Sequence, residues 1–105
     1  MLTIDSNKQC QTVLTTFECS PGTCTDLLEK LEEAYRDFIS KQQGFISAGL
    51  HVNDAQCRIA NYSQWERRED FQAMLRSAEM RRRNRELAAL CPRFEPVIYE
   101  VAGVF

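Results

Sequence analysis

Apolar residues recur with a helical period between residues 27 and 39, and charged side chains stand between them. The apolar positions are Leu27, Leu28, Leu31, Ala34, Tyr35, Phe38 and Ile39. This spacing of three to four residues predicts an amphipathic helix. We expect Thr23 to be its N-cap, with Asp26 three residues further on, and the helix to end near Gln43, just before Gly44.

Four segments have the composition of β-strands. Residues 11–19 are rich in Thr, Val, Leu and Phe, which favour strands. Residues 45–52 and 57–64 flank the short polar connection 53–56, and this arrangement predicts a β-hairpin. A last strand is predicted over residues 97–104, where apolar and mixed residues alternate.

Helical spacing returns after the hairpin and predicts two short helices, over about residues 66–77 and 78–90. Pro92 should end the second one, and a turn at residues 20–22 should precede the first long helix. The element order is therefore β-α-β-β-α-β, which is the ferredoxin-like α+β arrangement. Its helices cover one face of a four-stranded antiparallel sheet.

Both faces of this sheet carry apolar residues, but the helices can cover only one. The last strand is predicted to place Val97, Tyr99 and Val101 on one face and Ile98, Ala102 and Val104 on the other. The second strand is predicted to place Ile46, Ala48, Leu50 and Val52 on one face and Phe45 on the other. We therefore expect a homodimer in which sheet packs on sheet.

Length and charge narrow the class of protein. A chain of 105 residues, 44% of them hydrophobic, makes one domain, which we place at residues 11–105 after an N-terminal tail at 1–10. The net charge of −2 lacks the basic excess of nucleic-acid-binding domains. No apolar run approaches the roughly 20 residues of a membrane span, and residues 1–8 lack a signal-peptide core. We expect a cytoplasmic protein with no nucleic-acid or membrane partner.

The cysteines favour reduced thiols over a metal site or disulfides. They are Cys10, Cys19, Cys24, Cys57 and Cys91. The count is odd and no C-x-x-C spacing occurs, while a zinc site would need an unusual ligand set with one histidine in the chain. A Cys–His51 catalytic pair is possible by inventory, but nothing in the spacing supports it.

The hairpin carries the polar residues most suggestive of a site. Ile59, Asn61, Ser63 and Trp65 alternate along one strand and share a face. An Asn in mid-strand is locally unfavourable and needs hydrogen-bond partners if buried. Its amide, with the indole of Trp65, suits a flat oxygenated aromatic ligand. Alternatively, Asn61 is satisfied by local backbone and Trp65 is only a core residue.

His51 and the basic run at residues 81–85 each have a structural and a functional interpretation. His51, the one histidine, is a candidate general base because its pKa lies near neutrality; equally, it could face solvent or a dimer interface. The basic run 81–85 is flanked by Glu79 and Glu86 and is mostly a solvated helix face. One of its arginines could still turn inward and stabilise an anionic substrate.

At this point the residues resemble a known family. The segments 44–48 and 50–51, the block Asn-Tyr-Ser-Gln-Trp-Glu at 61–66 and the segment 77–81 are similar to the antibiotic biosynthesis monooxygenase domain. The likeness covers about residues 11–104. Within that family the chain most resembles the small quinone-forming monooxygenases of aromatic polyketide pathways.

The resemblance implies a dimeric ferredoxin-like α+β barrel with one pocket per subunit. It also implies oxidation of a phenolic or anthrone-type ring to a quinone by O₂, without flavin, haem or metal. The catalytic residues carried over are Asn61 and Trp65 as the principal pair, Arg81 as the pocket cation and His51 as a further pocket residue. Our hypothesis is that Asn61 and Trp65 donate to substrate oxygens and that Arg81 lowers the pKa of the phenol. In this hypothesis His51, or a water that it holds, takes the proton. The substrate-binding residues are Phe71, Ser63 and Ile59.

One position departs from the family pattern, and other activities stay open. Phe71 stands where related enzymes can have a pocket tyrosine, so a phenolic donor is lost there. Haem-degrading relatives use a histidine after the Trp, whereas this chain has Leu75 in that region.

Two alternatives to the monooxygenase function stay open. One is a non-catalytic dimeric domain that binds an aromatic metabolite, and the other is an enzyme that reduces or isomerises a small carbonyl compound.

Overall fold

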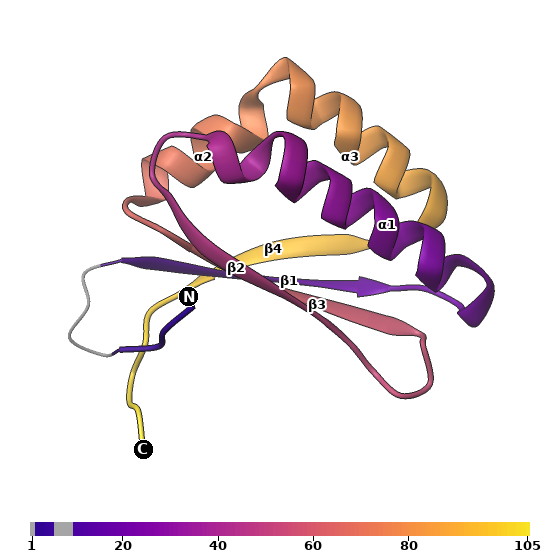
Figure 1. Cartoon of the computed structure of the whole chain (residues 1–105), viewed down its shortest axis with the longest axis horizontal. Coiled ribbons are helices and arrows are strands. Elements are labelled where there is room, and N and C mark those ends of the chain that lie inside the picture. The colour runs from indigo at the N-terminus through magenta and orange to yellow at the C-terminus, as the bar shows by residue number, and fades with distance from the viewer. Residues whose placement is uncertain (1, 6–9) are drawn as a thin grey trace.

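The computed structural model describes residues 2–5 and 10–105, so part of the expected N-terminal tail, residues 1 and 6–9, lies outside the described residues. The predicted order of strands and helices is confirmed (Figure 1). The elements are β1 (Gln11–Glu18), α1 (Pro21–Asp37), the 3₁₀ turn η1 (Ile39–Lys41), β2 (Phe45–Val52), β3 (Arg58–Trp65), α2 (Arg68–Arg76), α3 (Ala78–Leu90) and β4 (Phe94–Tyr99).

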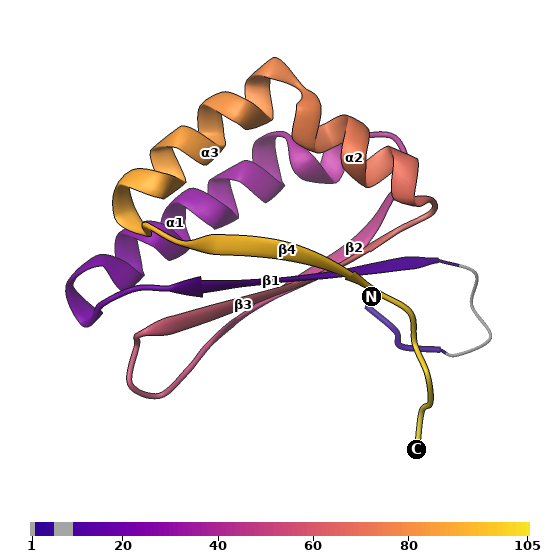
Figure 2. The same cartoon turned by 180° about the vertical axis from the view of Figure 1, so that it is seen from behind.

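The four strands form one antiparallel sheet in the order β2-β3-β1-β4. All three α-helices lie over the same face of this sheet, and the opposite face is left without a helix (Figures 1 and 2). This is the ferredoxin-like α+β fold expected from the sequence. No helix among the described residues is long and apolar enough to cross a membrane.

The start of α1 differs from the sequence prediction. Ser20, not Thr23, is the N-cap, and Pro21 is the first helical residue. The Thr23 hydroxyl accepts a hydrogen bond from the Ser20 backbone N–H at 3.1 Å, which makes Thr23 a partner of the cap. Proline suits this position because its fixed φ is already helical and its missing N–H would have no helical partner. The expected turn at residues 20–22 is therefore the first turn of the helix.

Gly44 joins the helical layer to the hairpin. The helix gives way to η1 after Asp37, and Gly44 then adopts a left-handed φ of 83°, a conformation that favours glycine. A Cβ atom added to Gly44 would collide with the carboxylate of Asp70, which is buried and paired with Arg67 at 3.0 Å. The Glu66 N–H donates to the Gly44 carbonyl at 2.7 Å, so this point also holds the end of β3.

A bulge in β2 changes the face of one residue. The register shifts between Phe45 and Ser47, so that Phe45 pairs with Trp65. The prediction placed Phe45 on the face opposite Ala48, but the extra residue reverses the alternation, and both lie on the helix-covered face. There the Phe45 ring meets the Trp65 indole edge-on, with centroids 5.5 Å apart.

The last strand spans residues 94–99, so the predicted range 97–104 was wrong at both ends. Pro96 lies within the strand and cannot donate a hydrogen bond to a neighbouring strand. Because β4 is at the sheet edge, proline is tolerated. Phe94, Pro96 and Ile98 alternate toward the helices, while Val97 and Tyr99 face the open side. The expected strand residues Val101, Ala102 and Val104 lie beyond the strand.

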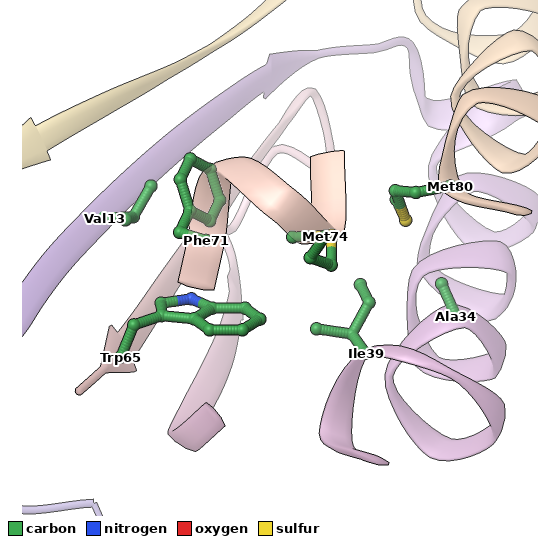
Figure 3. Packing of buried hydrophobic residues seen from close by; sticks show 7 residues of the cluster. All are labelled: Val13, Ala34, Ile39, Trp65, Phe71, Met74 and Met80. Carbon is green, nitrogen blue, oxygen red and sulfur yellow. The ribbon is translucent and has the colours of Figure 1, made fainter. Parts of the chain in front are cut away.

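Two buried clusters fill the space between helices and sheet. One surrounds Trp65 and is shown in Figure 3; its members are Val13, Ala34, Ile39, Trp65, Phe71, Met74 and Met80. The other comprises Phe17, Cys24, Leu27, Leu31, Ile59, Leu87 and Cys91. The five cysteines are free in this structure. Burial together with the neighbouring Cys24 thiol raises the pKa of Cys19 to about 11.

Candidate active site

A cavity of about 250 Å³ lies between the sheet and the helices, where the two clusters meet. Its apolar lining consists of Phe17, Leu31, Ile39, Phe71, Met74, Leu75, Met80, Leu87, Phe94 and Pro96. Its polar lining consists of Thr15, Tyr35, Asn61, Ser63 and Asn84. Apolar walls with a few placed polar groups are typical of small-molecule sites, although this volume is slightly below the usual range of roughly 300–1,000 Å³. None of these described lining residues is charged.

A hydrogen bond between α1 and β3 orients the polar wall. The Tyr35 hydroxyl donates to Asn61 Oδ1 at 2.7 Å. Asn61 and Ser63 are two apart on β3, so both point toward the helices. With Oδ1 engaged, the Asn61 Nδ2 group remains as the donor for a ligand, since no described residue accepts a hydrogen bond from it. The mid-strand Asn is therefore satisfied by a side chain, not by local backbone.

The phenol of Tyr35 stays protonated at neutral pH. Burial raises the pKa of Tyr35 to about 12, while hydrogen bonding with Asn61 and Ser63 acts in the opposite direction. Burial disfavours the charged phenolate, and this effect is the larger one. Tyr35 thus remains a hydrogen-bond donor that fixes the orientation of the Asn61 amide.

Trp65 lies behind the cavity wall. Its side chain is fully buried, and its indole N–H donates to Ser63 Oγ at 3.2 Å. The Phe71 ring packs against the indole with centroids 5.8 Å apart, as seen in Figure 3. The indole donor is therefore engaged within the protein, and Trp65 acts on the cavity through Ser63 and Phe71.

The structure does not bring His51 and Arg81 to the cavity. His51 is exposed near the end of β2, opposite Ala60, and so lies on the sheet face turned away from Asn61. Arg81 is exposed on α3 and is absent from the cavity lining. Neither side chain is placed to act on a ligand held beside Asn61 in the described chain.

The basic run on α3 is largely a solvated, ion-paired face. The Arg82 guanidinium pairs with Glu79 at 2.5 Å and with Glu86 at 2.9 Å, and Arg83 pairs with Glu79 at 2.8 Å. The residue of this run that lines the cavity is Asn84. The inward group of the run is thus a neutral amide.

Three positions were expected to bind substrate. Phe71 and Ser63 line the cavity. Ile59 is fully buried within the second core cluster and is not part of the lining. Ile59 therefore supports the floor of the site from within the core.

Tyr35 and Asn84 are site residues that the sequence prediction did not identify. Tyr35 was counted among the apolar positions of α1, where its ring fits the helical period. Asn84 lies four residues after Met80 and three before Leu87, and all three line the cavity. That spacing on one helix face is a signal that points to Asn84.

A second, more open depression of about 660 Å³ lies on the other side of Tyr35. We call it the outer groove; it is lined by Leu2, Glu32, Tyr35, Arg36, Ser40, Phe45, Ser47, Ala48 and Leu50. Because Tyr35 lines both spaces, a change in its position affects both of them. Within the described residues, no group of three or more His, Cys, Asp or Glu side chains is placed to hold a metal ion.

Solved structures share this fold. SnoaB of Streptomyces nogalater, described as a cofactor-independent oxygenase, superposes with a TM-score of 0.74 at 16% identity, over 92% of this chain and 97% of that one. A conserved protein of Methanosarcina mazei gives a TM-score of 0.78 at 13% identity, over 90% and 95% of the two chains. An anthrone oxidase-like protein gives 0.87 at 21% identity; it covers 94% of this chain but 42% of that longer one.

Sequence comparison gives the family. No curated protein matches the chain. The family model described as antibiotic biosynthesis monooxygenase matches residues 11–86, which includes β1 through most of α3 and most of the cavity lining. The chain belongs to the antibiotic biosynthesis monooxygenase family.

Proposed function

We propose that this protein is a cofactor-independent monooxygenase that oxidises a small phenolic or anthrone-type aromatic compound to a quinone with O₂. The observation that carries the proposal is the Tyr35–Asn61 hydrogen bond of 2.7 Å, which leaves an oriented amide donor on a largely apolar cavity. Family membership supports the reaction class. The descriptions of SnoaB as a cofactor-independent oxygenase and of another neighbour as anthrone oxidase-like support the substrate class.

The reaction draws its electrons from the substrate. The enol form of an anthrone gives an electron to O₂, and its hydroxyl proton follows, which leaves a ring radical and a hydroperoxyl radical. The two radicals combine at the ring carbon to form a hydroperoxide, which loses water to give the quinone. One oxygen atom of O₂ is retained, and the other leaves as water with the two hydrogens that the substrate loses.

The protein's tasks in this sequence are binding, orientation and exclusion of water. The Asn61 N–H donates to the substrate oxygen on which negative charge develops, and such a donor is worth about 3–4 kcal/mol in a dry site. Tyr35 holds the amide in place, and the Phe71 ring provides an apolar surface for the substrate. Because the enol passes on its own proton, the step uses no charged base in the cavity.

Oxygen consumption tests the proposal. We expect the purified protein to consume O₂ with an anthrone in a one-to-one ratio to quinone formed, in the presence of a metal chelator and without flavin. The matched variant is Asn61→Ala, which should retain binding but lose at least about tenfold in turnover. No turnover with a panel of anthrones and dihydroxyaromatic compounds, despite binding, would instead favour the non-catalytic binding domain.

The same proposal includes a homodimer formed through the open face of the sheet. This face carries Leu14, Ala60, Tyr62, Val97 and Tyr99, and Val97 and Tyr99 are 39% and 47% exposed. The Thr12 hydroxyl on this face is buried without a hydrogen-bond partner in the part of the chain described. An apolar surface of this kind usually marks an interface. Light scattering at micromolar concentration should give twice the monomer mass of 12.2 kDa.

A further inference from the structure

Helix α3 contributes one polar side chain to the cavity. Met80, Asn84 and Leu87 follow one another at helical spacing and line the same space. The basic residues between them point elsewhere, since Arg82 and Arg83 pair with glutamates on the outer face. Asn84 is therefore the position at which α3 offers hydrogen bonds to a ligand.

The side-chain amide of Asn84 is available for hydrogen bonds to a ligand. Among residues 2–5 and 10–105, no side-chain hydrogen bond to Asn84 is formed, and the residue is only partly exposed. An amide offers two donors and an acceptor. A ligand that fills the cavity displaces the water around this amide, and it loses affinity unless it supplies a hydrogen-bond partner in return.

A second amide approaches from the opposite layer. Asn61 belongs to β3 in the sheet, whereas Asn84 belongs to α3 in the helical layer above it. Most of the remaining lining is apolar, and none of the described lining residues is charged. Transfer of a charged group into such a space is costly without a paired charge. The two amides thus offer hydrogen bonds to a ligand from both layers of an uncharged cavity.

We propose that Asn84 determines specificity by selecting uncharged, flat aromatic compounds that carry at least two oxygen substituents, one directed toward Asn61 on β3 and the other toward Asn84 on α3. This inference rests on the proposed function in that the ligand is the substrate of the same cavity. It goes further in naming the charge of that substrate and the placement of its second oxygen. A substrate held as an anion by an arginine is not accommodated.

Anaerobic titration calorimetry tests this inference separately from turnover. The ligands are 2-naphthol, the 1,5-, 2,6- and 2,7-dihydroxynaphthalenes, and 2-naphthoate as the anionic analogue of 2-naphthol. At pH 7 we expect at least one dihydroxynaphthalene to bind about fivefold to tenfold more tightly than 2-naphthol, as one added hydrogen bond allows. We expect 2-naphthoate to bind at least about tenfold more weakly than 2-naphthol.

The variants assign the effect to Asn84. Asn84→Leu should bring the dihydroxynaphthalenes to within about twofold of 2-naphthol and leave the affinity for 2-naphthol itself nearly unchanged. Arg85→Leu, at an exposed neighbouring position outside the lining, should bind every ligand as the wild type does. Circular dichroism and thermal melting establish that both variants are folded, and Asn84→Ala replaces Asn84→Leu if the latter is not.

Any one of three results would overturn the inference. The first is that no naphthol binds, and the second is that 2-naphthoate and 2-naphthol bind with equal affinity. The third is that the Asn84 variant still prefers ligands with two oxygens. Because no oxygen is present, the result is independent of the oxygenase reaction. Selective binding with no turnover in air would retain the role of Asn84 and refute the proposed reaction, while turnover without this selectivity would do the reverse.

Discussion

The two faces of the sheet are built from the same four strands. They differ in how far the rest of the chain covers them and supplies hydrogen-bond partners to their side chains. On the helix-covered face, Asn61 and Ser63 receive hydrogen bonds from Tyr35 and Trp65. On the open face, Val97 and Tyr99 are exposed and the buried Thr12 hydroxyl has no partner among the described residues. A site needs polar groups held in place around a cavity, and among the described residues the covered face supplies both.

The N-terminal segment covers one part of the open face. Gln64 Nε2 donates to the Thr3 carbonyl at 2.7 Å, and Ser47 Oγ donates to Gln64 Oε1 at 2.8 Å. Gln64 is consequently buried even though it points away from the helices. Val97 and Tyr99, elsewhere on that face, are exposed, which is why we propose the dimer contact there and the chemistry on the other side.

The largest expected effect comes from the residue that joins the two layers. Gly44→Ala should lower the free energy of unfolding by about 3–4 kcal/mol, because it adds left-handed strain and forces the Asp70 carboxylate to move. Urea denaturation measures it. Gly22→Ala is the control. Gly22 is helical, and an added Cβ would lie 3.8 Å from Ser20 Oγ, which is ordinary contact, so this change should be neutral or slightly stabilising. Equal effects would contradict this account of Gly44.

Asn61→Ala tests the covered face. Loss of the oriented N–H donor should reduce turnover of an anthrone by about a hundredfold to a thousandfold, with a much smaller loss, of about tenfold or less, in the affinity for a product quinone. Steady-state oxygen uptake and anaerobic binding separate the two quantities. A variant with wild-type turnover would remove Asn61 from the reaction.

Val97→Glu tests the open face. A carboxylate placed in a sheet-on-sheet contact should weaken dimerisation about tenfold or more, because a buried charge without a partner is costly. Sedimentation analysis across a concentration series gives the dissociation constant. Glu95→Gln on the same strand is a mild control. If Val97→Glu stays as dimeric as the wild type, the interface lies elsewhere.

Tyr35→Phe removes one hydroxyl and leaves the ring. The loss of the bond to Asn61 should cost about 1 kcal/mol of stability and reduce turnover severalfold, since the amide is no longer held. The wild type should also lose stability relative to this variant as pH rises from about 10 to about 12, the pKa of Tyr35 in the folded chain. The sign follows because the folded state holds the phenol proton more tightly. Parallel pH curves would contradict the assignment.

The smallest effects are expected at residues outside the cavity. His51→Gln and Arg81→Gln should each change turnover by less than about twofold, although resemblance to the family implied catalytic roles for both. A larger loss, in a variant that remains dimeric, would show that assembly brings one of these side chains to the site. Comparison of monomeric and dimeric preparations would then locate that contribution.

Local sequence patterns predicted the order of elements because helix and strand periods are properties of neighbouring residues. They failed where a distant contact decides. The β2 bulge, which turns Phe45 toward Trp65, depends on the pairing with β3. Pro96 is accepted in β4 because that strand lies at the sheet edge, and edge position is set by the whole topology.

The sequence likewise predicted some of the residues that line the cavity and missed others. Alternation along β3 placed Asn61 and Ser63 on one face, and both line the cavity. Tyr35 and Asn84 required knowledge of how α1 and α3 are rotated above the sheet, which no local pattern determines. Arg81 and Asn84 are three residues apart on one helix, and the rotation of α3 decides which of them turns inward.

Tyr35 lines both the cavity and the outer groove, and its hydroxyl is the group that orients Asn61. A ligand in the outer groove that displaced the Tyr35 side chain would therefore also release the Asn61 amide. Occupancy of the groove and orientation of the donor in the cavity are thus coupled through one side chain.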